Sequence, residues 1–137
     1  MEYIVLAARI CLSLIFFNAG ISHLTGFSGF VKLIGSQGLP LASVLAAGTV
    51  FFQLLGAVSL LLGYKAKIGS VLLIIFLIPA SVMFHNPIAD PSQINDFLKN
   101  IGLMGGLLMV IYAGSGALSI DGKKKLTRTP YQDRELS

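Results

Sequence analysis

Charged residues are scarce in this chain. Only 12% of its 137 residues are Asp, Glu, Lys or Arg, about half the share in a typical soluble domain. Four long stretches contain none of them: 10–31, 33–64, 68–89 and 100–120. Runs of this length exclude an ordinary soluble domain, and they fit the hydrocarbon core of a bilayer.

Cysteine and tryptophan are nearly absent as well. Cys11 is the single cysteine and there is no tryptophan, so neither an intrachain disulfide nor a CxxC redox pair can form. The apolar neighbours of Cys11 predict a small, buried hydrophobic residue. At the start of the chain, Glu2 stands where a signal peptide would carry basic residues. We therefore expect the first apolar stretch to be a retained helix.

The apolar stretches predict an all-α, membrane-embedded four-helix bundle. The expected spans are 4–24, 41–63, 67–85 and 98–120, each near the ~20 residues that cross a ~30 Å core. Residues 1–122 would form this transmembrane domain, and residues 123–137 a basic cytoplasmic tail.

The first connector, 25–40, differs from the other two. It places Phe27, Phe30, Val31 and Ile34 on one helical face, which predicts a short helix lying in the membrane interface. The segment 63–67 is a tight turn, whereas 86–97 holds two prolines and no basic residue.

The basic residues predict the orientation. Because four spans put both termini and the second connector on one side, that side collects most of the positive charge: Lys65, Lys67, Lys123, Lys124, Lys125, Arg128 and Arg134. The positive-inside rule assigns this side to the cytoplasm. The overall net charge of +4 is thus explained by membrane flanks, and we expect no nucleic-acid partner.

Polar residues inside the spans fall at two predicted depths. Arg9 lies one to two turns above the cytoplasmic end of the first span, and Gln53 a turn or so further from the cytoplasm on the second. A long Arg9 side chain could reach Gln53. Ser13, Gly20 and His23 share the helical face of Arg9 at 100° per residue. Arg9 could also simply extend to the cytoplasmic headgroups.

The second set lies near the outer interface and suggests a polar pocket. It comprises His23, His85, Lys99 and Asn100. Two histidines on facing helices could ligate haem or a metal. Because two ligands alone are weak support for a metal site, we predict no metal site. The histidines could equally mark the water-facing ends of their helices. Lys99 begins a helix, where the dipole disfavours a cation, so we expect a partner such as Asp96 or an anionic ligand.

Several short segments, in order, resemble the DoxX family of membrane proteins over nearly the whole chain. They are 8–10 with 18–21, 38–40, 53–56 with 62–63, 84–86, 97–101, 105–108 and 114–122. The resemblance implies a four-helix bundle in the bacterial inner (plasma) membrane, similar in outline to the vitamin K epoxide reductases. Some relatives are subunits of thiosulfate:quinone oxidoreductase, and others are linked to membrane redox complexes.

Two departures from the family pattern bear on function. The family usually carries Glu where Gln53 stands, and Gln53 can hydrogen-bond but cannot carry charge or protons. Aromatic residues often follow the histidine-asparagine pair in the family, whereas this chain has Pro87 and Ile88. The single cysteine also excludes a catalytic dithiol.

Two functions stay open. The chain could be a membrane subunit linked to quinone redox chemistry, with Arg9, Gln53, His23, His85, Lys99 and Asn100 as the candidate cofactor-binding residues. It could instead be a non-enzymatic accessory or assembly subunit that packs against a larger membrane complex. Its partners would be the bilayer and other membrane subunits, and, for the first function, a quinone. A channel is disfavoured because one four-helix bundle leaves little lumen.

The orientation yields a first prediction. A reporter fused to the C-terminus should be active in the cytoplasm, because the basic residues retain that end there. A fusion after residue 88, in the third connector, serves as the control and should report the opposite side. A C-terminal reporter exposed outside the cell would contradict the assignment.

Overall fold

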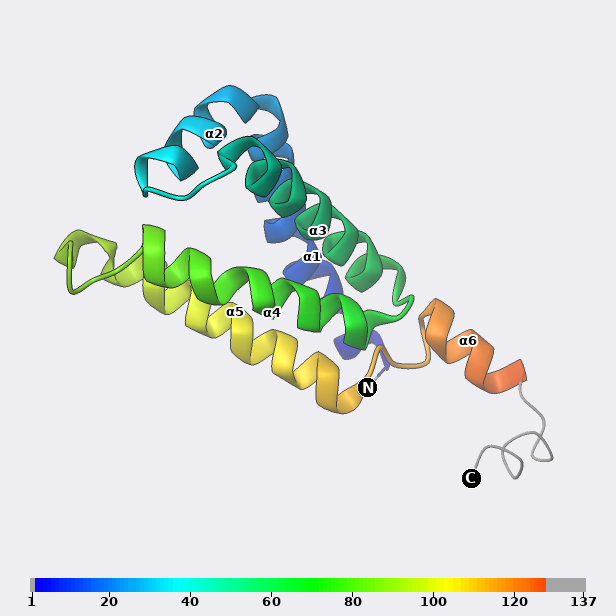
Figure 1. Ribbon diagram of the computed structural model, residues 1–137. Helices are drawn as coiled ribbons and strands as arrows, with labels where there is room; N and C mark the ends of the chain where they lie inside the picture. Colours follow the sequence, from blue (N-terminus) through cyan, green and yellow to red (C-terminus); the bar gives the residue numbers. More distant parts are fainter. Residues whose placement is uncertain (1, 128–137) are drawn as a thin grey trace.

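A computed structural model describes residues 2–127. Over these residues the chain is all-helical (Figure 1). Its elements are α1 (Glu2–Thr25), α2 (Phe27–Ser36), α3 (Ala42–Leu62), α4 (Ala66–Phe84), the 3-10 helix η1 (Pro91–Gln93), α5 (Ile94–Ala113) and α6 (Ile120–Thr127). Four segments are long and apolar enough to cross a membrane: α1, α3, α4 and η1 with α5. This confirms the predicted number of spans.

The fourth span begins and ends earlier than the predicted 98–120. The Asp90 side chain accepts a hydrogen bond from Ser92 N, and Pro91 occupies the first helical position, so helical structure starts there. The hydroxyl and backbone N–H of Ser92 hold the pKa of Asp90 below its usual value. At the other end, Gly114 adopts a φ of 79° and terminates α5. A loop then leads to α6, which crosses the predicted domain boundary at residue 122; residues 128–137 of the predicted tail lie outside the described part.

The predicted helix in the first connector is present as α2. Its apolar face lies against α3, where Phe30 and Ile34 are buried together with Ala46 and Val50. The face is therefore covered by protein, and α2 forms part of the bundle.

The helical face predicted for α1 is confirmed by burial, but the prediction for Cys11 is wrong. Arg9, Ser13 and Gly20 are buried, whereas Cys11 is exposed. Cys11 lies about 200° around the helix from Arg9 at 100° per residue. A uniformly apolar stretch does not indicate which side faces the protein, and Cys11 is on the other side.

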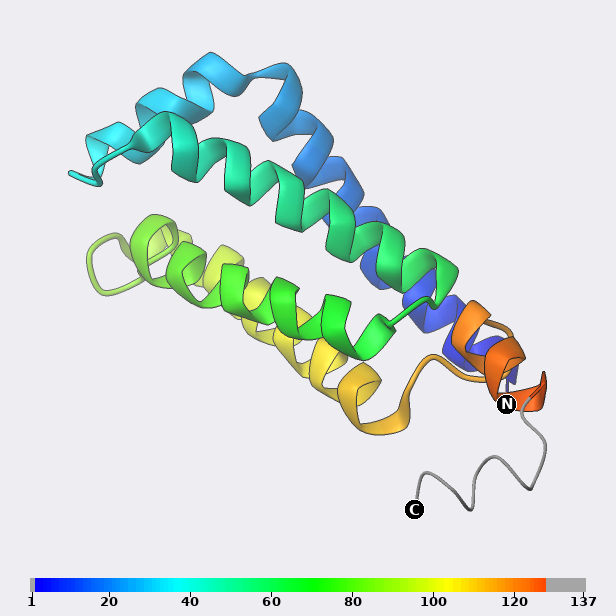
Figure 2. The same ribbon diagram turned by 45° about the vertical axis from the view of Figure 1, so that its right-hand side comes forward.

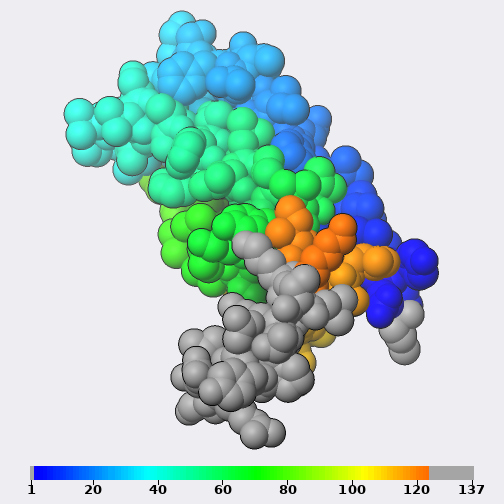
Figure 3. All heavy atoms as spheres, turned by 90° about the vertical axis from the view of Figure 1, so that its right-hand side faces the viewer, coloured from blue at the N-terminus to red at the C-terminus, as the bar shows by residue number. Residues whose placement is uncertain are grey.

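The helices form two arms. In one arm α1 and α2 pack on α3, and in the other α4 packs on α5; α3 and α4 join the arms. The arms are close together at the turn between α3 and α4 and diverge toward α2 (Figures 1 and 2). We call the closed end the α6 end and the other the α2 end. The start of α1, the end of α3 and α6 meet at the α6 end (Figure 3).

A buried arginine closes the α6 end. The Arg9 side chain is 1% exposed. Its Nη1 donates to the carbonyl oxygens of Leu60, at 3.1 Å, and Leu61, at 3.3 Å, and its Nη2 donates to that of Leu118. The last carbonyls of a helix have no partner within the helix, and a cation is favoured there by the helix dipole. Arg9 thus connects α1 to the end of α3 and to the loop before α6.

A carboxylate completes this junction. Asp121 accepts hydrogen bonds from the backbone N–H of Lys65, at 2.9 Å, and of Ala66, at 3.2 Å. It also accepts one from the Ser115 hydroxyl, at 3.1 Å. The first N–H groups of a helix need such acceptors, so Asp121 caps α4 from the far end of the sequence. In return, Asp121 N donates to Gly63 O at 2.9 Å.

Because Gly63 lies inside this junction, we expect even a substitution by alanine to destabilise the fold. This residue has a φ of 66°, and an added Cβ would overlap the Ser119 side chain and Arg9 Nη1. Gly63→Ala should therefore lower the free energy of unfolding by at least about 1–2 kcal/mol, the usual backbone penalty alone. Unfolding in detergent micelles, followed by circular dichroism, measures the change.

Gly102→Ala is the matched control. Gly102 lies inside α5 with open space where a Cβ would stand, so alanine should stabilise the helix by about 0.5–1 kcal/mol. Equal effects of the two substitutions would contradict the proposed close packing at the α6 end.

Candidate functional site

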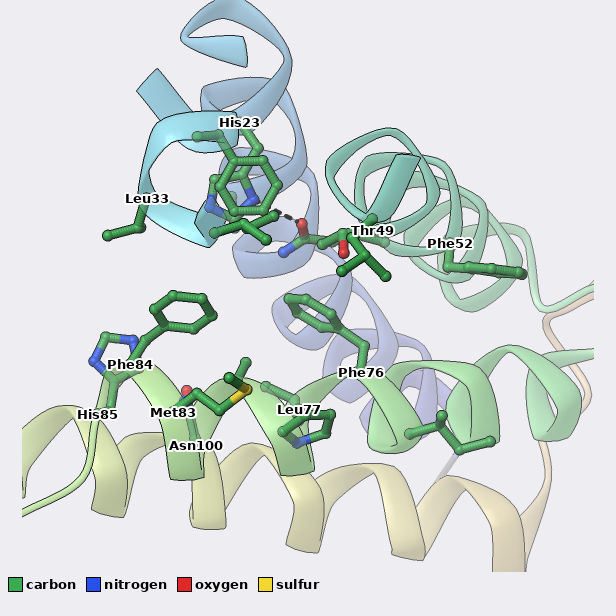
Figure 4. Close-up of a pocket in the computed structure, with 18 of the residues that line it drawn as sticks. His23, Leu33, Thr49, Phe52, Phe76, Leu77, Met83, Phe84, His85 and Asn100 are labelled. Atoms are coloured by element: carbon green, nitrogen blue, oxygen red, sulfur yellow. Dashed lines mark hydrogen bonds between the residues drawn. The ribbon is translucent and has the colours of Figure 1, made fainter. Parts of the chain in front are cut away.

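A cleft of about 810 Å³ opens between the two arms toward the α2 end (Figure 4). Its volume lies in the range of small-molecule sites. Residues of α1, α2 and α3 form one wall, and residues of α4 and α5 form the other. Most lining side chains are apolar, and five are aromatic: Phe16, Phe30, Phe52, Phe76 and Phe84. The cleft therefore suits a largely apolar molecule.

The α1 wall carries a polar pair. Nδ1 of His23 lies 3.1 Å from Oε1 of Gln53. The His23 ring also stacks on Phe30 of α2, with ring centroids 4.0 Å apart and planes 8° apart. Because an amide oxygen only accepts, Nδ1 carries the proton, and Nε2 of the neutral ring holds a lone pair. The His23 ring is thus fixed on both sides while Nε2 stays available.

The opposite wall carries a second histidine-glutamine pair. Nδ1 of His85, at the end of α4, lies 2.9 Å from Oε1 of Gln93 in η1. By the same reasoning, Nε2 of His85 is open to a ligand. Nearby, Asn100 Nδ2 donates to the Ser81 hydroxyl at 3.0 Å, a buried contact between α5 and α4.

Lys99 has the partner that the helix dipole led us to expect. Its Nζ lies 3.3 Å from Oδ1 of Asp96, and the two side chains are 48% and 49% exposed. An exposed pair of this kind stabilises the fold little. It does, however, neutralise the cation at the start of α5.

The structure brings five of the six candidate residues to one cleft: His23, Gln53, His85, Lys99 and Asn100. Arg9 is outside it, so the predicted pairing of Arg9 with Gln53 is wrong. Side chains lean toward the N-terminus of their helix. Because α1 and α3 run in opposite directions, Arg9 leans to the α6 end and Gln53 to the α2 end.

Two lining residues, Gln93 and Phe30, are not among the candidates that the sequence indicates. Gln93 falls in the predicted connector 86–97, although Asp90 followed by Pro91 is a recognisable helix start that places it in the first turn. Phe30 is predicted to face the membrane interface, and no local signal pairs it with His23. Together these residues orient both histidines.

The geometry of the two histidines bears on whether they could ligate a metal or haem. Each histidine has Nδ1 engaged and Nε2 open, which is compatible with ligation through Nε2. Among the described residues, no three His, Cys, Asp or Glu side chains gather as a metal site would require. Haem ligation by His23 and His85 stays an alternative that the sequence left open.

Comparison with known proteins gives a consistent family assignment. The DoxX family model matches residues 4–86. The inner membrane protein YphA of Escherichia coli (strain K12) is 31% identical over 124 residues, which cover 86% of this chain and 88% of that protein. The inner membrane protein YqjF of the same organism is 27% identical over 117 residues, covering 85% and 88%.

A more distant similarity reaches a eukaryotic protein. The ER-derived vesicles protein ERV29 of Saccharomyces cerevisiae (strain ATCC 204508 / S288c) is 35% identical over 83 residues, which cover 57% of this chain but 27% of that protein. No solved structure matches the chain. With the family model covering more than half of its residues, this four-span membrane protein belongs to the DoxX family.

Proposed function

We propose that this chain is a quinone-binding membrane subunit that works with a membrane redox system. The observation that carries the proposal is the cleft between the arms, with apolar walls and two oriented imidazoles. A quinone matches this combination of polar and apolar groups, because its carbonyl groups need hydrogen-bond partners and its hydrophobic tail needs apolar surface.

The headgroup would lie between the two walls. A neutral imidazole Nε2 accepts a hydrogen bond from a quinol hydroxyl, and a protonated one donates to a quinone carbonyl. His23 and His85 lie on opposite walls of the cleft. Their Nδ1 atoms are engaged by Gln53 and Gln93, which fixes the ring planes before a ligand arrives. Such preorganisation favours binding.

The isoprenoid tail of the quinone would extend from the cleft into the bilayer between α3 and α4. Val44, Leu45 and Phe52 on α3 and Ile75 on α4 line the cleft and are also exposed, between 42% and 65%. Apolar residues that are both exposed and part of the lining mark an opening toward the lipid. A hydrophobic tail could thus remain in the bilayer while the headgroup is bound.

The electrons would come from another subunit. Reduction of a quinone to a quinol consumes two electrons and two protons. Cys11 is the only cysteine of the chain and cannot supply a dithiol. The two histidines can hold or transfer protons, so the proposal assigns them binding and proton positioning, and assigns electron transfer to a partner.

The relatives indicate in which membrane the protein lies. Both bacterial relatives are named inner membrane proteins, and we infer the same membrane for this chain, with both termini in the cytoplasm as the basic residues predict. The α6 end would then face the cytoplasm, and the cleft would lie near the outer surface.

An accessory role is the second candidate, and α5 favours it. The outward face of α5 joins exposed apolar side chains to two glycines that have open space around them, Gly102 and Gly105. The apolar members are Leu98, Ile101, Leu108, Met109 and Tyr112. Small residues on such a face allow another membrane helix to approach closely.

A pair of glycine substitutions separates the two functions. Gly48 on α3 lines the cleft and has open space at the Cβ position, so Gly48→Phe should fill the cleft without disturbing the backbone. We expect quinone that co-purifies in mild detergent, measured by extraction and ultraviolet absorbance, to fall by about tenfold, equivalent to ~1.4 kcal/mol of binding.

Gly105→Phe is the matched control on α5. It should retain quinone, because Gly105 lies outside the cleft lining, and it should release any complex that packs on α5. If Gly48→Phe retains bound quinone, or if the wild-type protein carries none from quinone-rich membranes, the quinone proposal fails. Loss of a co-purifying complex in Gly105→Phe alone would support the accessory role.

A further inference from the structure

A second cleft, of about 670 Å³, lies at the α6 end. It is formed by the start of α4 and by the loop that joins α5 to α6. The lining includes Lys65, Lys67, Ile68, Gly114 and Asp121. None of these residues belongs to the cleft between the arms. A ligand here would be independent of the proposed quinone function.

The lining supplies two cations. Lys65 and Lys67 are exposed, and the Lys65 ammonium lies 5.6 Å from the centre of the Tyr64 ring. Within residues 2–127, Lys67 makes no ion pair or hydrogen bond through its side chain. Neither lysine forms a salt bridge with another described residue, and two such lysines on one concave surface fit an anionic group.

The Asp121 carboxylate in the lining does not cancel the positive charge of Lys65 and Lys67. Both oxygens of Asp121 are engaged, by Lys65 N, Ala66 N and the Ser115 hydroxyl. Asp121 is thus already paired with helix donors, and the Arg9 guanidinium is its electrostatic neighbour. The other described carboxylate at this end, Glu2, does not line the cleft.

The position of the cleft indicates what kind of anion would bind. α4 begins at Ala66 and α5 ends at Ala113, so the cleft lies where two spans leave the hydrocarbon and the lipid headgroups begin. Ile68 lines the cleft and is 58% exposed. The surface therefore combines an apolar side chain with two cations, which is complementary to the acyl chains and the anionic headgroup of a phospholipid.

The loop leaves space for the headgroup. Gly114 and Gly116 adopt φ values of 79° and 78°, which favour glycine, and no side chain projects from these two positions. The volume is enough for a glycerophosphate headgroup. We propose that this cleft binds the phosphate of an anionic phospholipid between Lys65 and Lys67.

The proposal can be tested with phosphatidylglycerol. The full-length protein in phosphatidylcholine nanodiscs should gain thermal stability when phosphatidylglycerol is added, and native mass spectrometry should show it retained. The variant Lys65→Asn with Lys67→Gln removes both charges; Asn tolerates the φ of 48° at position 65. We expect its affinity for phosphatidylglycerol to fall by about 30-fold.

The matched control removes two lysines from the other end of the bundle. Lys32→Gln with Lys99→Gln changes the net charge equally and should keep the phosphatidylglycerol affinity. Equal losses in both double variants would reveal only a general charge effect and would overturn the site. If inorganic phosphate alone stabilises the protein as much as the lipid does, the ligand is free phosphate and the lipid proposal is wrong.

Discussion

The buried guanidinium of Arg9 is the constraint on which this bundle depends. A cation inside a membrane-spanning helix is costly unless it finds acceptors, and Arg9 donates to the backbone carbonyl oxygens of Leu60 and Leu61 at the end of α3 and of Leu118 in the last loop. The same junction includes the Asp121 carboxylate, which satisfies two backbone donors at the start of α4. One cation and one anion thus stabilise the ends of three spans without a direct ion pair between them.

Because the strong polar contacts gather at one end, the other end is free to open. Toward the α2 end, the contacts across the arms become apolar, and the polar groups instead pair within each wall. His23 binds Gln53 on the first arm, and His85 binds Gln93 on the second. A bundle fixed at one end and divided at the other provides a cleft without needing a lumen. This arrangement explains how a chain of 137 residues can form a cleft of about 810 Å³.

Much of the fold could be predicted because the membrane makes hydropathy decisive. The four spans follow from where charge is absent, the helix in the first connector follows from its one-sided apolar face, and the gathering of polar residues follows from their depth along the spans. The partner of Arg9 could not be found that way, since it depends on the direction in which side chains lean on antiparallel helices. The early end of α5 depends on the φ of Gly114. The cap that Asp121 provides joins residues 55 apart in sequence, beyond the reach of any local pattern.

The Asp121 cap also bears on the order in which the protein is made. The first turn of α4 emerges during synthesis long before its capping carboxylate, and Arg9 enters the bilayer before Leu118 exists as an acceptor. The spans must therefore insert with these donors and acceptors satisfied by water or headgroups at the membrane surface. The last segment then replaces those temporary partners. Arrival of Leu118 and Asp121, after the fourth span, is therefore the step that completes the contacts at the α6 end.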